Sequence, residues 1–306
     1  MKSIQKHKNP WLVVKNQRNT KQSSNTLNHL INLFENELLA INAINSQLAS
    51  FFGPKSSYVE SLSPTTANDI YLNVNHHKIA KIISTLKNSY LGHNNEPPSF
   101  LIKRAKDLLA YPLSLIFKQC IVQNNYPTSW KTSLIIPLPK SNLPALDNLR
   151  PISILPILSK IFEKCMLSSV RNSMETTFGN NQFGFRSKSS TQCAIISLHD
   201  YTIRLKELYK NNTVFILSFD ISKAFDSVCH DKLLSILHVL TMPPNFINLM
   251  KSYLINRQQK VIYKSIESDL LPINSGVPQG SVLGPLLFNI YIAGLEPSNS
   301  SIKCFK

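Results

Sequence analysis

The sequence is short of acidic residues and of glycine. Only 17 of its 306 residues are Asp or Glu, against 33 Lys or Arg, so the formal net charge of +16 comes mostly from missing acids. A chain this basic favours polyanionic partners, either nucleic acid or an anionic membrane surface, and charge alone does not choose between them. The glycines number eight, and three of them lie close together, at Gly276, Gly280 and Gly284.

Two further absences exclude classes of protein. No apolar stretch reaches the ~18 residues of a membrane span, since the longest, Val282 to Leu295, is interrupted by Pro285 and Asn289. We therefore expect no membrane partner. The five cysteines form no C-x-x-C pair, which argues against zinc ribbons, redox dithiols and disulfide scaffolds and makes a reducing compartment the default. Apolar residues at 43% suffice for a sizeable core in one large or two small units.

Residues 1–26 are predicted to form a basic flexible tail. This stretch is rich in Lys, Asn, Gln and Ser, and the first acidic residue of the chain is Glu35. No apolar segment follows the basic residues, so a cleaved signal peptide is not expected. A mitochondrial presequence shares the acid-poor, basic composition and remains an alternative.

Helix-like and strand-like patterns are mixed along the rest of the chain. Apolar residues at helical spacing predict helices over 27–52, 76–86, 100–122, 152–166, 231–240 and 245–255. Residues 55–75 read as loop. Short strands are predicted at 134–136, at 214–221 as a buried strand, and at 258–265 as an exposed one. Because this order is no regular β-α-β alternation, it favours the α+β class.

The first chemical signal is an aspartate at the end of the apolar run 214–221. A carboxylate in such a place is costly to bury unless it is paired or binds a metal. Asp220 is therefore the best candidate for a metal ligand, and the alternative is that it caps the following helix. Asp226 lies six residues on, near the same edge, and for Asp226 the helix cap is the favoured interpretation.

The second signal is the glycine cluster. Gly276-Val277-Pro278-Gln279-Gly280 is predicted to form a tight turn before a helix that begins near Ser281. Missing side chains would let a flat ligand approach the backbone closely. No G-K-[ST] follows, so the segment is not a P-loop. A plain turn at the start of a helix is the alternative.

The third signal is a set of basic residues between 131 and 188. Such a run is usually a solvated face, but Lys140 and Arg150 flank proline-rich turns. Residues 181–186, which read NQFGFR, interleave aromatic rings with a cation. Stacking rings beside cations suit a nucleic-acid strand.

Four segments together resemble a known family. They read NLRPISILPILSKIFEKCM, NNQFGFRSKSST, FILSFDISKAFDSVCHDKLL and SGVPQGSVLGPLLFNIYI. In this order and spacing they are similar to successive blocks of the reverse transcriptases of non-LTR retrotransposons, the LINE-like, jockey-type elements. Fainter similarity extends upstream through NNYPTSWKTSLIIPLPK to about Asn42.

The resemblance implies a right-hand polymerase fold and an RNA-directed DNA polymerase. Residues 131–210 would form fingers, residues 211–306 a partial palm with an incomplete antiparallel sheet, and residues 27–130 a helical N-terminal extension, with the thumb absent. The implied partners are an RNA template, a DNA primer and a deoxynucleoside triphosphate, and no obligate protein partner can be inferred. Family membership further implies the cytoplasm with access to the nucleus.

The resemblance also assigns roles to single residues. It implies Mg²⁺, with Mn²⁺ as a substitute, held by the Asp220 carboxylate and the Ile221 backbone carbonyl. Phe225 matches the bulky residue that screens the sugar 2′ position. The residues implied to contact the nucleotide are Phe225, Gln279, Gly280, Lys140 and Arg150. Those implied to contact the template are Arg186, Phe183 and Pro278, and Arg186 is expected either to position the template or to brace the fingers.

The sequence departs from the family after the glycine cluster. The family carries an aromatic-Ala-Asp-Asp hairpin there, whereas this chain closes on SIKCFK and its only carboxylate side chain after Gly280 is that of Glu296. We therefore expect an incomplete metal site and no polymerisation by this chain alone. The alternative function is a non-catalytic nucleic-acid-binding remnant. A phosphotransferase of the D-x-D type is a weaker third, because Asp220-Ile221-Ser222 lacks the second aspartate.

Overall fold

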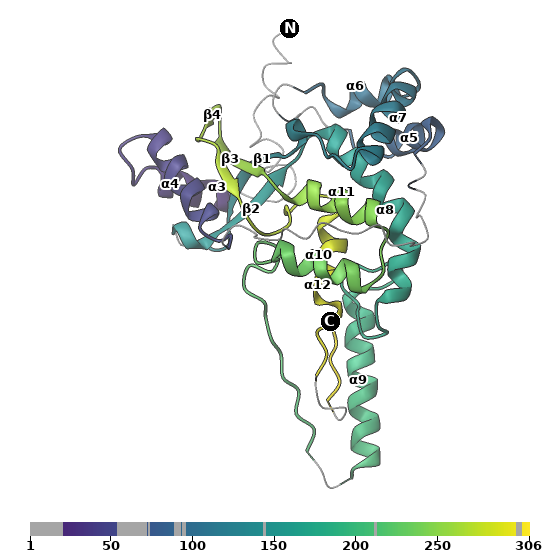
Figure 1. The fold of residues 1–306 in the computed structure, drawn as a ribbon. Helices are drawn as coiled ribbons and strands as arrows, with labels where there is room; N and C mark the ends of the chain where they lie inside the picture. Colours follow the sequence, from purple (N-terminus) through teal and green to yellow (C-terminus); the bar gives the residue numbers. More distant parts are fainter. Residues whose placement is uncertain are drawn as a thin grey trace.

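The computed structural model describes residues 21–53, 72, 74–88, 93, 96–142, 145–210, 213–297 and 302–306. Residues 1–20 of the predicted tail and most of the predicted loop 55–75 lie outside these ranges, while residues 21–26 belong to a helix. Figure 1 shows the fold. The α-helices are α3 (Lys21–Ile31), α4 (Glu37–Ala49), α5 (His76–Ser84), α6 (Ser99–Arg104), α7 (Lys106–Val122), α8 (Ile157–Thr177), α9 (Thr191–Leu208), α10 (His230–Val239), α11 (Pro244–Leu254) and α12 (Gly284–Ala293).

A small mixed sheet lies at the centre of the fold. Its order is β2-β1-β3-β4, with β5 also paired to β3. β1 pairs with β2 in antiparallel and with β3 in parallel orientation, so the sheet is mixed. Helices and a mixed sheet agree with the α+β expectation. The strands are β1 (Thr132–Pro139), β2 (Leu149–Ile154), β3 (Arg257–Tyr263), β4 (Ile266–Glu267) and β5 (Leu271–Ile273).

Two N-terminal helices cover one face of the sheet. The predicted helix 27–52 is in fact two, α3 and α4, because Asn36 caps the second by accepting a hydrogen bond from the Leu39 backbone N–H at 2.8 Å. Their apolar residues pack against Ile135 of β1 and Val261 of β3. Asn45 Oδ1 accepts from Gln259 Nε2 at 3.0 Å, so α4 is also tied to β3 by a buried polar contact. The N-terminal extension is therefore part of the folded body.

The larger core is helical. It gathers apolar residues of α5, α7, α8, α10, α11 and α12, and its centre is a set of aromatic rings in mutual contact. Phe162 of α8 packs against Phe117 of α7, with ring centroids 4.7 Å apart, and Tyr253 of α11 meets Tyr126 edge to face at 5.0 Å. Burial on this scale is the main stabilising term of the fold. None of the described helices is long and apolar enough to cross a membrane.

Two predicted elements differ in detail. The predicted helix 152–166 begins later, at Ile157, because residues 149–154 pair with β1 as β2 and Pro156 precedes the first helical turn. The predicted strand 258–265 exists as β3 but is not an exposed one. Every second side chain along it is buried, because one face of β3 packs against α3 and α4. The predicted helix 100–122 divides into α6 and α7 at Ala105.

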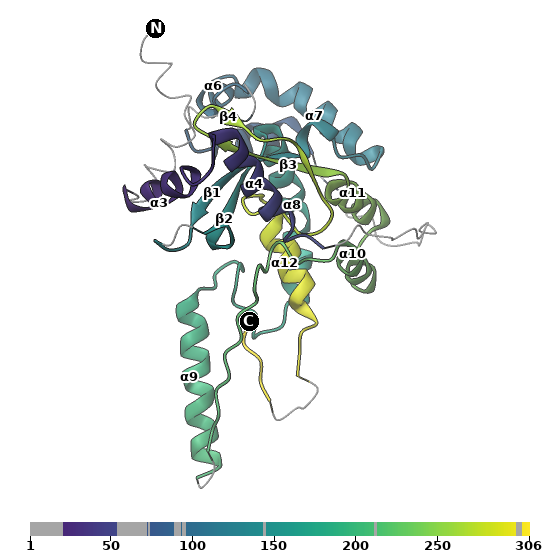
Figure 2. The ribbon, with the colours of Figure 1, turned by 90° about the vertical axis from the view of Figure 1, so that its left-hand side faces the viewer.

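The predicted buried strand at 214–221 is wrong. These residues form an extended segment outside the sheet, with Phe215 84%, Leu217 78% and Phe219 87% exposed. Figures 1 and 2 show the segment running beside no strand, below the body from which α9 also projects. The apolar pattern is that of a strand, but within the described residues no strand pairs with it. A strand without pairing partners gains no burial, so its sequence preference is not realised.

This segment is expected to limit solubility. Residues 215, 217, 219 and 221 alternate along an extended backbone, so their side chains share one face and the edges are free to pair with another molecule. Replacing Phe215 and Phe219 together with threonine should reduce self-association without lowering the melting temperature, because neither side chain is buried. Light scattering while the protein is concentrated measures self-association, and a thermal melt measures the melting temperature. Unchanged aggregation, or a melting temperature lowered by several degrees, would contradict this description.

Candidate functional site

The predicted glycine turn is docked onto two other parts of the chain. The Val277 backbone N–H donates to the Phe225 carbonyl at 2.8 Å, and the Gly276 N–H donates to the Val228 carbonyl at 2.7 Å. On the other side, the Ser153 N–H of β2 donates to the Gln279 carbonyl at 2.8 Å. The turn therefore links the loop after the extended segment to the edge of the sheet, and it brings two sequence signals together.

Glycine is required here by backbone packing. Gly276 and Gly280 have φ angles of +80° and +127°, a region that side chains rarely allow. A Cβ on Gly276 would lie 2.9 Å from the Asp226 Cα, and one on Gly280 would lie 2.4 Å from the Ser153 carbonyl oxygen. The side of Gly280 on which a Cβ would stand is thus filled by β2, while the rest of the residue is exposed. This packing explains the glycine without a ligand.

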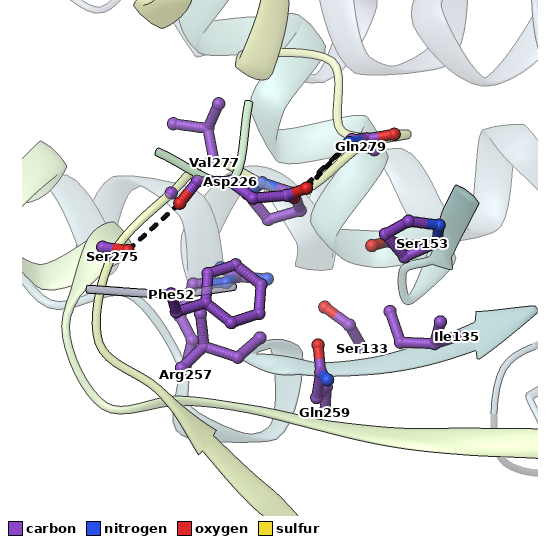
Figure 3. Close-up of a pocket in the computed structure, with 14 residues that line it drawn as sticks. Phe52, Ser133, Ile135, Ser153, Asp226, Arg257, Gln259, Ser275, Val277 and Gln279 are labelled. Atoms are coloured by element: carbon purple, nitrogen blue, oxygen red, sulfur yellow. Dashed lines mark hydrogen bonds between the residues drawn. The ribbon is translucent and has the colours of Figure 1, made fainter. Parts of the chain in front are cut away.

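Asp226 is the buried acid of the site. It is 4% exposed, and its two carboxylate oxygens accept from Gln279 Nε2 at 3.4 and 3.3 Å, as Figure 3 shows. Ser275 Oγ donates to the Asp226 carbonyl at 3.1 Å. Burial raises the pKa of this carboxyl to about 6, although the Gln279 hydrogen bond and the charges of Lys223 and Lys140 act to lower it. Asp226 is therefore a partner of the glycine turn, and the favoured prediction that it caps a helix is wrong.

The raised pKa makes stability depend on pH. Between the ordinary aspartate pKa of 3.8, which applies to the unfolded chain, and the folded pKa of about 6, the folded state binds more protons than the unfolded state, so stability falls as pH rises through this window. Asp226→Asn should remove this slope and raise the free energy of unfolding at pH 7.5 by about 1–3 kcal/mol. Urea unfolding between pH 4.5 and 7.5 measures it. Asp147→Asn, at an exposed position, should leave the slope in place, and an unchanged slope in Asp226→Asn would refute the assignment.

The end of α4 closes the site from the N-terminal side. The Gly53 N–H donates to Ser275 Oγ at 2.7 Å, and the Phe52 ring lines the pocket beneath the turn. Lys223 Nζ lies 3.1 Å from the centroid of the Phe51 ring, a cation–π contact. Nothing in the sequence marked residues 51–53 as part of the site, because a Phe-Phe-Gly sequence at a helix end is equally typical of an ordinary helix terminus.

Phe225 is held by other rings. It stacks on Phe288 of α12 with centroids 5.1 Å apart, and Phe185 meets it edge to face at 5.8 Å. Its side chain is half-buried, so one part of the ring stays accessible next to the turn. The structure thus places the predicted sugar-screening residue beside the predicted turn.

Lys140 and Arg150 lie together at the open end of the β1–β2 pair. Leu138 pairs with Arg150, and the Lys140 N–H donates to the Asn148 carbonyl at 2.8 Å, so the two cations are two ladder positions apart on one face. Both side chains are exposed. The charge of Lys140 acts to lower the pKa of the Asp226 carboxyl. Lys140 and Arg150, which the sequence places beside separate proline-rich turns, therefore lie at the border of the same site.

Glu163 anchors the helix that follows the turn. Its side chain is fully buried in α8, and its Oε2 accepts from the Val282 and Leu283 N–H groups at 2.7 and 3.0 Å. Ser159 Oγ donates to its other oxygen at 2.9 Å. Burial raises the pKa of this carboxyl, which the hydrogen bonds from Leu283 and Ser159 oppose. A carboxylate at the start of α12 is also favoured by the helix dipole.

Arg186 and Phe183 are engaged within the protein. Arg186 forms an ion pair with Glu175, with Nε 3.1 Å from Oε2, and its Nη1 donates to the Gly179 and Gln182 carbonyls. These contacts fit a bracing role, and template positioning by Arg186 stays a prediction. Phe183 stacks on Phe305 with centroids 6.3 Å apart.

Asp220 is not gathered with the other site residues. It lies in the extended segment, its side chain is exposed, and the predicted burial is wrong for the reason given for that segment. Ile221 follows in the same extended backbone. Within the described residues no three side chains of His, Cys, Asp or Glu come together as a metal site would require. A two-ion centre needs carboxylates from two elements, and the residues present do not fit one.

Comparison with known proteins identifies the chain. The family model described as reverse transcriptase (RNA-dependent DNA polymerase) matches residues 138–304, which is more than half of the sequence. The chain belongs to the reverse transcriptase family. The match includes Lys140, Arg150 and the whole glycine turn of this reverse transcriptase domain. The resemblance seen in the four sequence segments is thereby confirmed.

Several relatives of this reverse transcriptase domain come from mobile elements. It is 33% identical over 196 residues to a probable RNA-directed DNA polymerase from transposon BS of Drosophila melanogaster, covering 61% of this chain and 21% of that protein. It is also 33% identical to the RNA-directed DNA polymerase from mobile element jockey of the same species, covering 60% and 20%. The domain is thus of the non-LTR retrotransposon kind, and the chain spans about a fifth of the length of the curated relatives it matches.

Proposed function

We propose that this chain supplies the part of an RNA-directed DNA polymerase that holds the template and the incoming deoxynucleoside triphosphate. The observation that carries the proposal is the turn 275–280, fixed to β2 and to the Phe225–Val228 loop and bordered by Lys140 and Arg150. Backbone and side-chain groups on such a turn can meet a base pair, and cations beside it attract phosphates.

Six of the predicted residues have proposed roles at this turn. Gln279, Gly280 and Pro278 would face the template base and the nucleotide, while Phe225 would screen the sugar. Lys140 and Arg150 would hold the triphosphate, since both are exposed on one face of the hairpin. The proposed fingers (131–210) and partial palm (211–306) would share the central sheet, because β1 and β2 belong to the first range and β3 to β5 to the second.

Divalent metal is used by the reverse transcriptase family in general, and we infer that these 306 residues do not hold it alone. Asp220 is an exposed single carboxylate, and Asp226 is turned toward Gln279. With Asp220 and the Ile221 carbonyl as the only proposed ligands, Mg²⁺ or Mn²⁺ would lack the second group of carboxylates. The 306-residue polypeptide is accordingly proposed to bind primer–template without extending it.

Binding and extension are tested separately. Fluorescence anisotropy with an RNA template annealed to a DNA primer should give an affinity that falls steeply with salt. The double variant Lys140→Gln with Arg150→Gln should reduce the salt slope by about two and weaken binding at low salt. Lys118→Gln with Lys206→Gln, two exposed lysines away from the site, is the charge-matched control. Equal losses of affinity in the two double variants would refute a specific role of Lys140 and Arg150 in nucleic-acid binding.

Primer extension on poly(rA) with Mg²⁺ or Mn²⁺ tests the catalytic part of the proposal. We expect no incorporation by the 306-residue polypeptide. Incorporation that disappears in Asp220→Ala would overturn this expectation and restore a catalytic role to the chain alone.

A non-catalytic nucleic-acid-binding function is the second candidate, favoured by the net charge of +16. The two functions differ in whether a deoxynucleoside triphosphate tightens binding to primer–template. We further propose a cytoplasmic protein with access to the nucleus, on the grounds of family membership, and a fluorescent fusion observed in cells tests this.

A further inference from the structure

Beneath the glycine turn lies a small pocket whose lining mixes polar and apolar side chains. Its floor is formed by Ser133 of β1 and Arg257 of β3, its roof by the turn, and one side by Phe52, as Figure 3 shows. About 20 Å³ of it is open to the centre of a water-sized particle. That space is enough for one small occupant and too little for a tetrahedral oxyanion.

Two of the lining side chains are buried and carry polar atoms without a hydrogen-bond partner, although the Arg257 guanidinium carbon also lies 5.0 Å from the centroid of the Tyr253 ring. Arg257 is 1% exposed, and its Nη1 donates to the Tyr253 carbonyl at 3.1 Å, but its Nε and Nη2 have no hydrogen-bond partner. Ser133 is fully buried, and its Oγ is likewise without a partner. A buried guanidinium with three free N–H groups is unusual, because unmade hydrogen bonds of a charged group are costly.

The positive charge of Arg257 is not neutralised by an ion pair. Among the described residues no carboxylate lies within 4 Å of it. Lys131, the residue before β1, is 6% exposed. Burial lowers its pKa and the charge of Arg257 lowers it further, so two buried cations lie near each other where the parallel strands begin.

The acids that face Arg257 are occupied elsewhere. Glu163 accepts from the N-terminal N–H groups of α12, and Asp226 lies across the pocket with its carboxylate turned toward Gln279. His230 also faces Arg257, but burial lowers its pKa and its Nε2 is hydrogen-bonded to the Gly276 carbonyl oxygen. Glu163 and Asp226 thus contribute negative charge nearby, but neither supplies an acceptor for Arg257 Nε and Nη2.

We propose that Arg257 and Ser133 form a buried binding site for one small monovalent anion, chloride in ordinary salt solutions. The anion would accept from Arg257 Nε and Nη2 and from the Ser133 hydroxyl, and it would offset the charge shared with Lys131. A water molecule fits the space but accepts only two hydrogen bonds, fewer than these donors offer. The site lies beneath the turn that carries the proposed template and nucleotide contacts, and halide binding to it requires neither nucleic acid nor nucleotide.

Bromide is the probe for this site. In crystals of the 306-residue chain soaked in sodium bromide, an anomalous peak is expected within hydrogen-bond distance of Arg257 and Ser133. In solution, bromide or chloride should raise the melting temperature by several degrees in a saturable manner relative to sodium gluconate at equal ionic strength. A water molecule at this position with no bromide peak would overturn the proposal.

Variants connect the shift to the residues. Arg257→Gln should abolish the halide-dependent shift, whereas Arg204→Gln, on the surface of α9, should retain it. If Arg257→Gln does not fold, Ser133→Ala keeps the charge and removes one donor, and its half-saturating halide concentration should rise roughly tenfold. A halide shift of unchanged size and midpoint in Ser133→Ala would count against the site.

Discussion

Replacing Gly280 with alanine is expected to lower the free energy of unfolding by about 3 kcal/mol or more. The new Cβ would lie 2.4 Å from the Ser153 carbonyl oxygen, which is backbone and cannot rotate away, and the φ angle of +127° is strained for alanine. β2 or the turn must therefore shift, and the hydrogen bond between the Ser153 N–H and the Gln279 carbonyl would be lost.

Urea unfolding followed by circular dichroism measures this loss. Gly294→Ala is the matched control, because a Cβ there meets nothing within 4 Å and the φ angle is −79°. We expect the control to change stability by less than about 1 kcal/mol. Equal stabilities for the two variants would show that the turn does not lie against β2 as described.

Replacing Glu163 with alanine is expected to be as damaging, at roughly 3–5 kcal/mol. The substitution would leave the Val282 and Leu283 N–H groups without their acceptor at the buried start of α12, and Ser159 would lose its acceptor as well. Because α12 carries Phe288, the ring under Phe225, the position of Phe225 should loosen too.

Glu163→Gln separates the hydrogen bonds from the charge. The amide oxygen can still accept from α12, so this variant should lose less than half of the stability lost by Glu163→Ala. Chemical denaturation of both variants is the measurement, and near-ultraviolet circular dichroism reports on the aromatic contacts. If Glu163→Gln were as unstable as Glu163→Ala, the negative charge, and not the capping of α12, would be the main contribution.

The elements with a complete local pattern were predictable from the sequence. Helices α10 and α11 agree with the predicted ranges 231–240 and 245–255 to within one residue at each end, because apolar spacing and the prolines before α11 act within a few residues. The glycine turn was also predictable, since closely spaced glycines such as Gly276 and Gly280 indicate a turn, and the chain has few glycines elsewhere. Membership of the reverse transcriptase family followed from the order of four segments.

The predictions that were wrong concern features that depend on contacts between residues far apart in the sequence. Whether 214–221 becomes a strand is decided by a neighbouring strand, and nothing within the run reveals whether one is present. The sequence favoured a helix cap for Asp226 and did not reveal its hydrogen bond to Gln279, because Gln279 lies 53 residues away. That Ser133 and Arg257 line one pocket beneath the turn could not be found from spacing, since residues of two strands so far apart in the sequence come together only after the chain between them has folded.

The parallel pairing of β1 with β3 has a consequence for how the protein is made. Thr132 lies opposite Gln258, and Asn42 of α4 is bonded to Asp269, 227 positions away. Contacts of such long range form slowly. During synthesis the first half of the domain must leave the ribosome with its sheet unfinished, and it stays incomplete until nearly the last of these residues emerges. Unpaired strand edges in a nascent chain are prone to aggregation, so we expect the yield to improve when translation or growth temperature is reduced.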